Sequence, residues 1–184
     1  MKNPSANRSA GFTAIELMTV LAIVAILLTV VVPSFLGLTQ KNRVAAQING
    51  FVGDLQFARA EAIKQGQPVT ICASTNGSAC SGSATWETGW IVFADPDSNQ
   101  TRNATGITEA VIRQQPAWSG TDTFRASSSV SSVTYSRDGF ALGSTATATF
   151  TLRTVPANAD AIRCVTVNVS GKQQVLSNNG SSCV

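Results

Sequence analysis

The stretch GFTAIELMTVLAIVAILLTVVVPSF, residues 11–35, decides how the rest of the sequence is interpreted. Residues 17–32 carry no charge, but this run is slightly shorter than the roughly 20 residues that a membrane-spanning helix needs. Adding residues 12–15 completes a span and places Glu16 inside it. A carboxylate within a bilayer costs about 3 kcal/mol or more unless a cation pairs with it. Glu16 is therefore a candidate functional residue.

Two other interpretations of this stretch stay open from the residues alone. In the first, Glu16 only marks the polar edge of a shorter helix. In the second, the stretch is an ordinary secretory signal, with Lys2 and Arg8 as its basic region. The second is disfavoured because PSFLG, residues 33–37, is no small-x-small cleavage site and helical periodicity continues beyond it.

Composition limits the function classes. The 184 residues include 43% apolar residues, as in one globular domain, but only 12% charged residues, about half of the usual share. The net charge of +3 falls to +1 without Lys2 and Arg8, so composition gives no sign of nucleic-acid binding. The sequence lacks histidine, which excludes Ser-His-Asp and Cys-His catalysis and His-ligated metals. We expect no enzymatic activity, no catalytic residue and no cofactor.

After Thr39 the pattern predicts the second half of a long helix. Apolar residues recur on one face at three- and four-residue steps, namely Val44, Ile48, Phe51, Leu55, Ala58 and Ala62. The remaining face carries Lys41, Arg43, Gln47, Asp54, Arg59 and Glu61. A helix from Phe12 to about Lys64 would be roughly 80 Å long. Gly66 and Pro68 supply its stop signal.

The rest of the chain is typical of short strands separated by polar turns. Strands are predicted at residues 69–73, 89–94, 110–114, 133–136, 146–153, 162–169 and 173–176. Ser170 and Gly171 predict a tight hairpin turn between the last two of these strands. The predicted fold class is therefore α+β.

Two further groups of residues suggest binding but favour ordinary structural roles. Asp95, Asp97 and Asn99 alternate in a way that offers oxygens to calcium, yet the Gly and Glu of an EF-hand loop are missing. We interpret this segment as a solvated turn and expect no metal site. Aromatic residues beside strands are more often core than base- or sugar-stacking platforms. We expect core or interface positions for Trp86, Trp90 and Trp118.

The N-terminal residues resemble a known signal. GFTAIELM, residues 11–18, follows a short basic leader and precedes an apolar run, and it resembles the class III signal of type IV pilins and type II secretion pseudopilins. The resemblance implies that a prepilin peptidase cuts between Gly11 and Phe12 and that Phe12 is N-methylated. It also implies that Glu16 pairs with the N-terminal ammonium of a neighbouring subunit. The expected domains are a leader at 1–11, a transmembrane and assembly segment at 12–38, and a periplasmic head at 39–184.

The head resembles the GspH/FimT/FimU group of minor pilins and pseudopilins. The matching stretches are ARAEAIKQG at 58–66, Trp86 with GWIVF at 89–93, SRDG at 136–139, and the hairpin around Gly171. The resemblance implies a long helix packed on small, mainly antiparallel sheets, in a minor subunit that starts assembly at the filament tip. Its partners would be other minor and major pilins and the inner-membrane assembly platform. The chain would be a single-pass inner-membrane protein with a periplasmic head before it enters the tip.

Two alternatives follow from the same resemblance. One is a pseudopilin of a type II secretion system, and the other is a DNA-binding minor pilin in natural transformation. Some relatives bind DNA through a C-terminal Gly-Arg-x-Arg motif, and the matching residues here are Gly171, Lys172, Gln173 and Gln174. Gln174 replaces the second cation, so we expect weak phosphate contacts. Arg163 and Lys172 are the candidate DNA contacts.

Four cysteines allow three disulfide pairings. The simplest choice closes two short loops, Cys72 with Cys80 and Cys164 with Cys183. A head that has crossed into an oxidising compartment should form them. The wide spacings argue against a four-cysteine metal site, which favours close Cys-x-x-Cys pairs.

Overall fold

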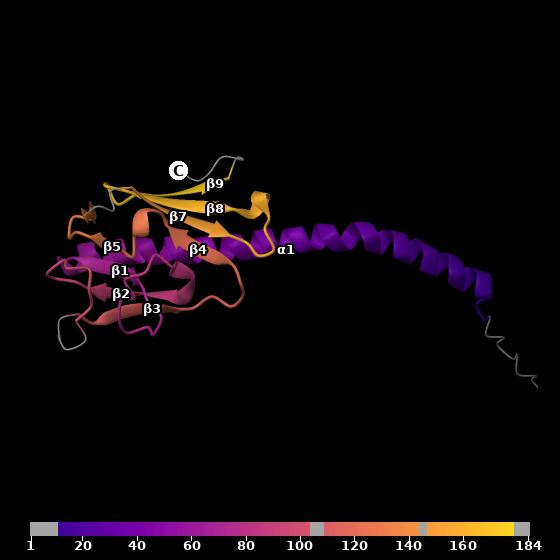
Figure 1. Cartoon of the computed structure of the whole chain (residues 1–184), viewed down its shortest axis with the longest axis horizontal. Helices are drawn as coiled ribbons and strands as arrows, with labels where there is room; N and C mark the ends of the chain where they lie inside the picture. The colour runs from indigo at the N-terminus through magenta and orange to yellow at the C-terminus, as the bar shows by residue number, and fades with distance from the viewer. Residues whose placement is uncertain (1–10, 104–108, 144–146, 179–184) are drawn as a thin grey trace, which may run out of the picture. The chain divides into compact units, whose positions relative to one another are not determined.

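The computed structural model describes residues 11–103, 109–143 and 147–178. The chain forms two compact units that divide between Thr39 and Gln40. Helix α1 (Ala14–Gln65) begins in the first unit and ends in the second (Figure 1). It ends at the predicted stop, where Gly66 adopts a left-handed φ of 67° and donates its N–H to the carbonyl of Ala62 at 3.0 Å.

Two antiparallel sheets make up most of the second unit, with β1–β3 on one side of α1 and β7–β9 on the other (Figure 1). One sheet has the order β3-β2-β1-β5-β6 and consists of β1 (Val69–Ala73), β2 (Gly89–Ala94), β3 (Val111–Pro116), β5 (Ser132–Tyr135) and β6 (Ala141–Leu142). The other has the order β4-β7-β8-β9 and consists of β4 (Thr123–Ala126), β7 (Thr147–Arg153), β8 (Arg163–Asn168) and β9 (Gln173–Ser177). Short 3-10 helices occur at Trp86–Thr88, Ser127–Ser129 and Ala159–Ala161.

The α+β prediction is confirmed, and the predicted strands correspond to β1, β2, β3, β5, β7, β8 and β9. Strands β1 and β2 have the predicted bounds, and the described ends of the other predicted strands shift by at most two residues. Strands β4 and β6 were not predicted. Strands of four and two residues contain too little alternation to stand out from turns.

The predicted apolar face of α1 forms the core. All six of its residues are at most 1% exposed, and they pack against side chains from both sheets. Phe51 lies at the centre, with ring centroids 5.4, 5.2, 4.8 and 4.9 Å from those of Trp86, Trp90, Phe124 and Phe150. The core positions predicted for Trp86 and Trp90 are confirmed, and the half-buried Trp118 packs against the same cluster.

Asp54 corrects the prediction that it lies on the polar face of the helix, because it is only 7% exposed. One carboxylate oxygen accepts a hydrogen bond from the indole N–H of Trp90 at 2.8 Å. The other pairs with Arg113 at 2.7 Å, and the Arg113 guanidinium lies 4.2 Å from the ring centroid of Phe57. These partners come from β2 and β3, so helical periodicity alone could not reveal them.

We expect Phe51→Ala to lower the free energy of unfolding by about 3–5 kcal/mol, because it empties the centre of the aromatic cluster. Phe140→Ala is the matched control: Phe140 is 53% exposed, so its loss should change stability by less than about 0.5 kcal/mol. Urea unfolding of the detergent-solubilised chain, followed by tryptophan fluorescence, measures both. Equal decreases in the free energy of unfolding for the two variants would contradict the central position of Phe51 in the core.

Candidate functional site

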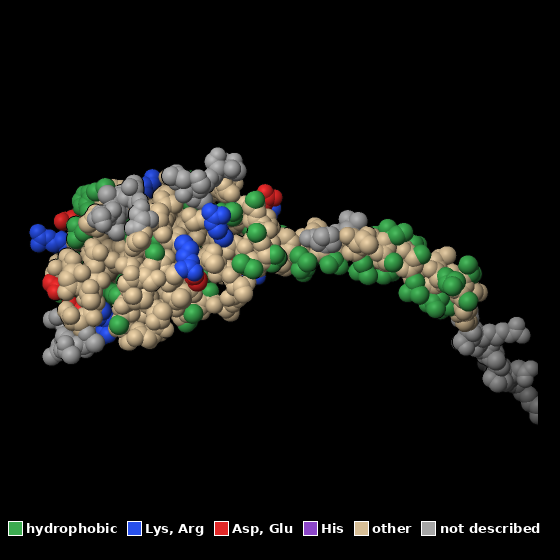
Figure 2. Space-filling model, viewed as in Figure 1, with side chains coloured by type: hydrophobic (Ala, Val, Ile, Leu, Met, Phe, Trp, Pro, Cys, Tyr) green, Lys and Arg blue, Asp and Glu red, His purple; other side chains and the backbone are tan. Residues whose placement is uncertain are grey.

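The first unit presents an apolar helix surface. None of the side chains that the structure describes between residues 12 and 39 is buried, and Phe12 and Met18 are 88% and 69% exposed. Hydrophobic side chains cover this part of α1 in Figure 2. The helix is long and apolar enough to cross a membrane. Such a surface requires lipid or another protein as cover.

Glu16 takes part in a capping box at the start of α1. Its backbone N–H donates to Oγ1 of Thr13 at 3.3 Å, and its carboxylate accepts the N–H of Thr13 at 3.5 Å. The pattern Thr-x-x-Glu is the sequence signature of this motif, and the sequence analysis overlooked it. Within one chain, the carboxylate of Glu16 therefore satisfies a backbone N–H at the start of α1, as expected of a residue at the polar edge of a helix.

Arg59 joins three stretches that are distant in the sequence. From α1 its Nε donates to the carbonyl of Gly139 at 2.8 Å, and its Nη2 donates to the carbonyl of Ser170 at 3.1 Å. Gly139 and Gly171 have left-handed φ values of 82° and 73°. A Cβ on Gly171 would lie 2.2 Å from the Gly139 oxygen, so only glycine permits this approach of the two turns. The sequence resemblance includes all three stretches, but their contact with one another was not predicted.

The candidate DNA contacts do not come together. Lys172 is exposed and borders a hollow of about 440 Å³ that Arg59, Gln56 and Gln173 also line. Arg163 lies at the other end of the β8–β9 hairpin, about 17 Å or more away along the strand, and donates to two nearby carbonyls. Arg59 is engaged by the two turns, so among the described residues that line this hollow Lys172 is the cation whose side chain makes no such backbone contact. One lysine gives little affinity for a polyphosphate.

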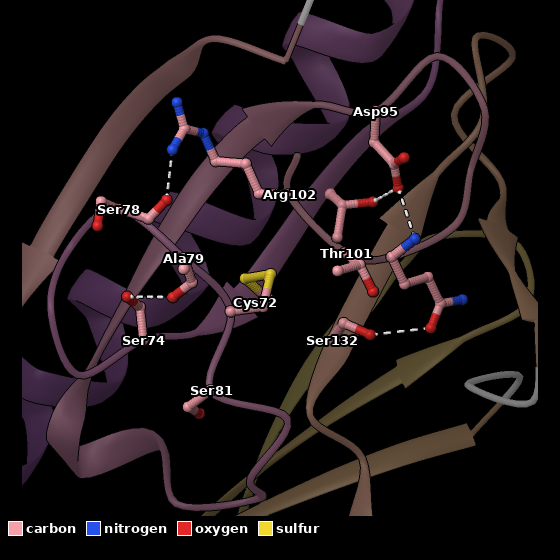
Figure 3. Close-up of a disulfide and its surroundings, with 12 residues drawn as sticks. Cys72, Ser74, Ser78, Ala79, Ser81, Asp95, Thr101, Arg102 and Ser132 are labelled. Atoms are coloured by element: carbon pink, nitrogen blue, oxygen red, sulfur yellow. Dashed lines mark hydrogen bonds between the residues drawn. A yellow bond between two sulfur atoms is a disulfide. The ribbon is translucent and has the colours of Figure 1, made fainter. Parts of the chain in front are cut away.

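The predicted bridge between Cys72 and Cys80 is present. It closes the loop after β1, and Figure 3 shows its surroundings. Cys164 is buried in β8. Its predicted partner, Cys183, lies outside the described residues, so the second bridge stays a prediction.

The bridged loop is also held by polar contacts (Figure 3). The hydroxyl of Ser74 donates to the carbonyl of Ala79 at 2.7 Å. The guanidinium of Arg102 donates to the carbonyl of Ser78. This loop is thus attached to the segment that follows β2.

Asp95 is fully buried, which corrects the interpretation of a solvated turn at this residue, whereas Asp97 and Asn99 are exposed as expected. Its carboxylate accepts hydrogen bonds from Oγ1 of Thr70 at 2.6 Å and from the backbone N–H groups of Asn99 and Gln100 at 3.2 and 3.1 Å. Burial raises the pKa of Asp95 above its ordinary value. The segment is a turn, but one organised around a buried carboxylate whose hydrogen-bond donors the sequence pattern did not reveal.

A family model described as Type II transport protein GspH matches residues 47–171, which is more than half of the chain. The protein belongs to the GspH family. Its match includes Arg59, Gly139 and Gly171, so the contact between the two turns lies within the GspH region. Glu16 and Lys172 lie outside that region. Among curated proteins, no match was found.

Solved structures show the same fold. A crystal structure of the type IV minor pilin FimU from Pseudomonas aeruginosa has a TM-score of 0.57 and 21% identity, and the match covers 76% of this chain and 92% of that one. A second crystal form gives 0.50 and 20%, with 75% and 90% covered. The chain thus combines membership of the GspH family with the fold of the FimU structures. Proteins of this class are structural subunits that interact with other pilins, not enzymes.

Tyr135 of β5 contacts the β8–β9 hairpin of this GspH family member through Gln173. Its ring is fully buried, and its hydroxyl accepts a hydrogen bond from Nε2 of Gln173 at 2.8 Å. Burial raises the pKa of Tyr135 from 10.0 to about 12, although the hydrogen bond from Gln173 and the charge of Arg59 oppose this shift. Between about pH 10 and pH 12, Tyr135 therefore keeps its phenolic proton in the folded state but loses it in the unfolded state. The resulting stability is complete below about pH 10 and is lost as the pH rises toward about 12.

Tyr135 is the sole tyrosine of the chain, so its ionisation can be followed directly. We expect the phenolate absorbance of the folded protein to rise with a midpoint near pH 12, and that of the urea-unfolded protein near pH 10. Tyr135→Phe should abolish both signals and weaken the loss of stability between these pH values. A midpoint near pH 10 in the folded protein would contradict the burial of this ring.

Proposed function

We propose that the protein is a minor type IV pilin that helps to initiate pilus assembly and sits in the tip complex. In this proposal residues 1–11 are a leader that prepilin peptidase removes, and residues 12–38 anchor the chain in the inner membrane. Residues 39–184 form the periplasmic head. The processed chain then joins other minor and major pilins at the assembly platform.

One observation carries this proposal. A folded head continues, through α1, into a helix segment whose described side chains are uncovered and which carries a single charge after Phe12, that of Glu16. Lipid covers the apolar side chains while the chain is in the membrane. In a filament, other helices must replace the lipid, and a carboxylate inside such a bundle needs a cation. The N-terminal ammonium of a neighbouring subunit, created by cleavage after Gly11, would be that cation.

The disulfide supports a periplasmic head. Structural disulfides form and persist in oxidising compartments and are rare in the cytosol. The bridge between Cys72 and Cys80 lies in the second unit and follows the apolar segment in the sequence, whereas the expected leader precedes that segment. This arrangement fits a head that crosses the membrane and a leader that stays on the cytoplasmic side.

A pseudopilin of a type II secretion system is the second candidate. The description of the matching family favours it, whereas the FimU structures favour a pilus subunit. Both functions require the same leader, anchor and head. DNA capture is less favoured, because the turn at Gly171 presents one lysine and Arg163 lies at the far end of its hairpin.

The first test concerns processing. Mass spectrometry of protein from assembled filaments should show a chain that begins at N-methylated Phe12. Gly11→Val should leave an uncut precursor in the membrane, because the larger side chain replaces the glycine that the peptidase requires. Intact Met1 in assembled filaments would refute the assignment of the leader.

The second test separates the two roles of Glu16. Glu16→Gln keeps the capping box, since glutamine also serves at this position, but removes the charge, whereas Glu16→Ala removes both. If charge pairing drives assembly, both variants should lower incorporation by about tenfold or more, because an unpaired buried ammonium costs over about 1.4 kcal/mol. The measurement is the ratio of subunit in sheared filaments to subunit in membranes.

Glu61→Gln is the control for this test. Glu61 lies near the other end of α1 and forms an exposed ion pair with Lys64 at 3.0 Å, so its loss should leave incorporation unchanged. Normal incorporation of Glu16→Gln together with failure of Glu16→Ala would assign Glu16 to capping alone and refute the charge pair.

A further inference from the structure

Exposed apolar side chains gather at the end of the head where α1 ends. Ile63, Phe140 and Val169 come from three stretches that are distant in the sequence, and they are 53%, 53% and 55% exposed. Cδ1 of Ile63 lies 3.0 Å from the place that a Cβ on Gly139 would take. The backbone N–H of Ala141 donates to the carbonyl of Val169 at 3.0 Å. The three apolar side chains therefore belong to one surface, which we call the end patch.

The hollow beside Lys172 borders the end patch, and Ile63 belongs to both. We call it the basic hollow. Its volume is about 440 Å³, and its lining consists of Gln56, Arg59, Ala60, Ile63, Lys172 and Gln173. Two cations and two amides therefore line the basic hollow, and no carboxylate does. Such a lining suits an anionic group.

The two cations of the basic hollow are not neutralised by a carboxylate in the described part of the chain. Arg59 donates to two neutral backbone carbonyls. The hydrogen bonds of Lys172 with the described residues use only its backbone. Glu61, the nearest carboxylate to Arg59 along α1, is already paired with Lys64 at 3.0 Å. An anion that enters the basic hollow would therefore meet two uncompensated positive charges.

Cations outnumber anions around this surface. The end of α1 and the two turns contribute four cations against two carboxylates, namely Arg59, Lys64, Arg137 and Lys172 against Glu61 and Asp138. This local surplus exceeds the net charge of +1 that the chain has without Lys2 and Arg8. Figure 2 shows hydrophobic side chains near Lys and Arg side chains at this end of the head. The surface thus combines exposed apolar area with positive charge, which is complementary to a partner that is apolar and acidic.

We propose that the end patch and the basic hollow bind an acidic peptide segment of another protein, in which a carboxylate stands within a few residues of a large apolar side chain. The carboxylate enters the basic hollow and accepts a hydrogen bond from Nζ of Lys172. The apolar side chain covers the end patch and removes it from water. A pilus subunit and a secretion pseudopilin could both use this contact, so it does not depend on the proposed function.

A nucleic acid fits this surface less well than an acidic peptide. Its phosphates form a long row of charges, whereas the basic hollow offers two cations. Its charged backbone would also leave the apolar side chains of the end patch without an apolar partner. A peptide supplies both kinds of group at the spacing of neighbouring residues.

Selection from a displayed library of short random peptides tests the occupant. The target is the full-length chain in detergent. We expect the enriched peptides to combine Asp or Glu with a large apolar residue a few positions away. Enrichment of basic peptides, of peptides without a carboxylate, or of none at all would overturn the proposal.

Reversing one charge tests the basic hollow. Lys172→Glu should weaken binding of the selected peptide by about tenfold or more, measured by fluorescence anisotropy, because a like charge then faces the carboxylate. Lys41→Glu is the matched control, since Lys41 is an exposed lysine of α1 outside this surface and its change should leave the affinity as it was. Replacing the carboxylate of the peptide by an amide should weaken binding to the unchanged protein but not to Lys172→Gln. Equal affinity of the two peptides for the unchanged protein would refute the role of Lys172.

Two substitutions test the end patch. Val169→Ser and Phe140→Ala should each weaken peptide binding by about threefold or more, because they remove apolar area that the peptide covers. Val155→Ser is the control: Val155 is 49% exposed, lies outside the end patch, and should not affect binding. Thermal unfolding midpoints should stay within about 2 °C of the unchanged protein, since all three side chains are exposed. Unchanged affinity in both patch variants would overturn the proposal.

A short DNA duplex serves as the competitor in the same assay. At physiological salt it should fail to displace the labelled peptide, because two cations give little affinity for a polyphosphate. Displacement by duplex at a lower concentration than unlabelled peptide requires would assign this surface to nucleic acid and overturn the proposal.

Discussion

The burial of one face of α1 under two separate sheets is the constraint on which the head depends. Phe51 makes this plain, because its ring contacts Trp90 from the five-stranded sheet and Phe124 and Phe150 from the four-stranded sheet. Sheets of four and five strands have inner faces that must be covered, and here a single helix covers both. The helix is therefore the shared core of the head, and a change at Phe51 affects both sheets at once.

Polar contacts then hold this helix to the surrounding strands and turns. Arg43 binds Asp122, Asp54 binds Trp90 and Arg113, and Arg59 binds the carbonyls of two turns. Each of these contacts involves a charged group, which makes it stronger than a neutral hydrogen bond. These contacts are spaced along α1 and lie on the side of the helix that packs in the head. The opposite face of the helix does not take part in them.

The sequence predicted those features that depend on near neighbours along the chain. The apolar face of α1 follows from three- and four-residue spacing, and strands β1 and β2 follow from short runs rich in β-branched and aromatic residues, bounded by turn residues. The misassigned residues were buried carboxylates. Asp54 and Asp95 look like surface residues, since an isolated charge is rarely buried, and each is buried only because donors from other segments reach it. The capping box at Thr13 and Glu16 is different, because its signal was present in the sequence and was overlooked.

The sequence by itself determined that this protein has an apolar N-terminal helix with one carboxylate, an amphipathic continuation and a head of short strands. Composition and local periodicity suffice for these, because they reflect contacts between residues a few positions apart. Only the tertiary structure decided the order of the strands and the meeting of Arg59 with the turns at Gly139 and Ser170. Those contacts join residues 80 and 111 positions apart. They form only when strand register and core packing bring the chain segments together, and no local pattern encodes that geometry.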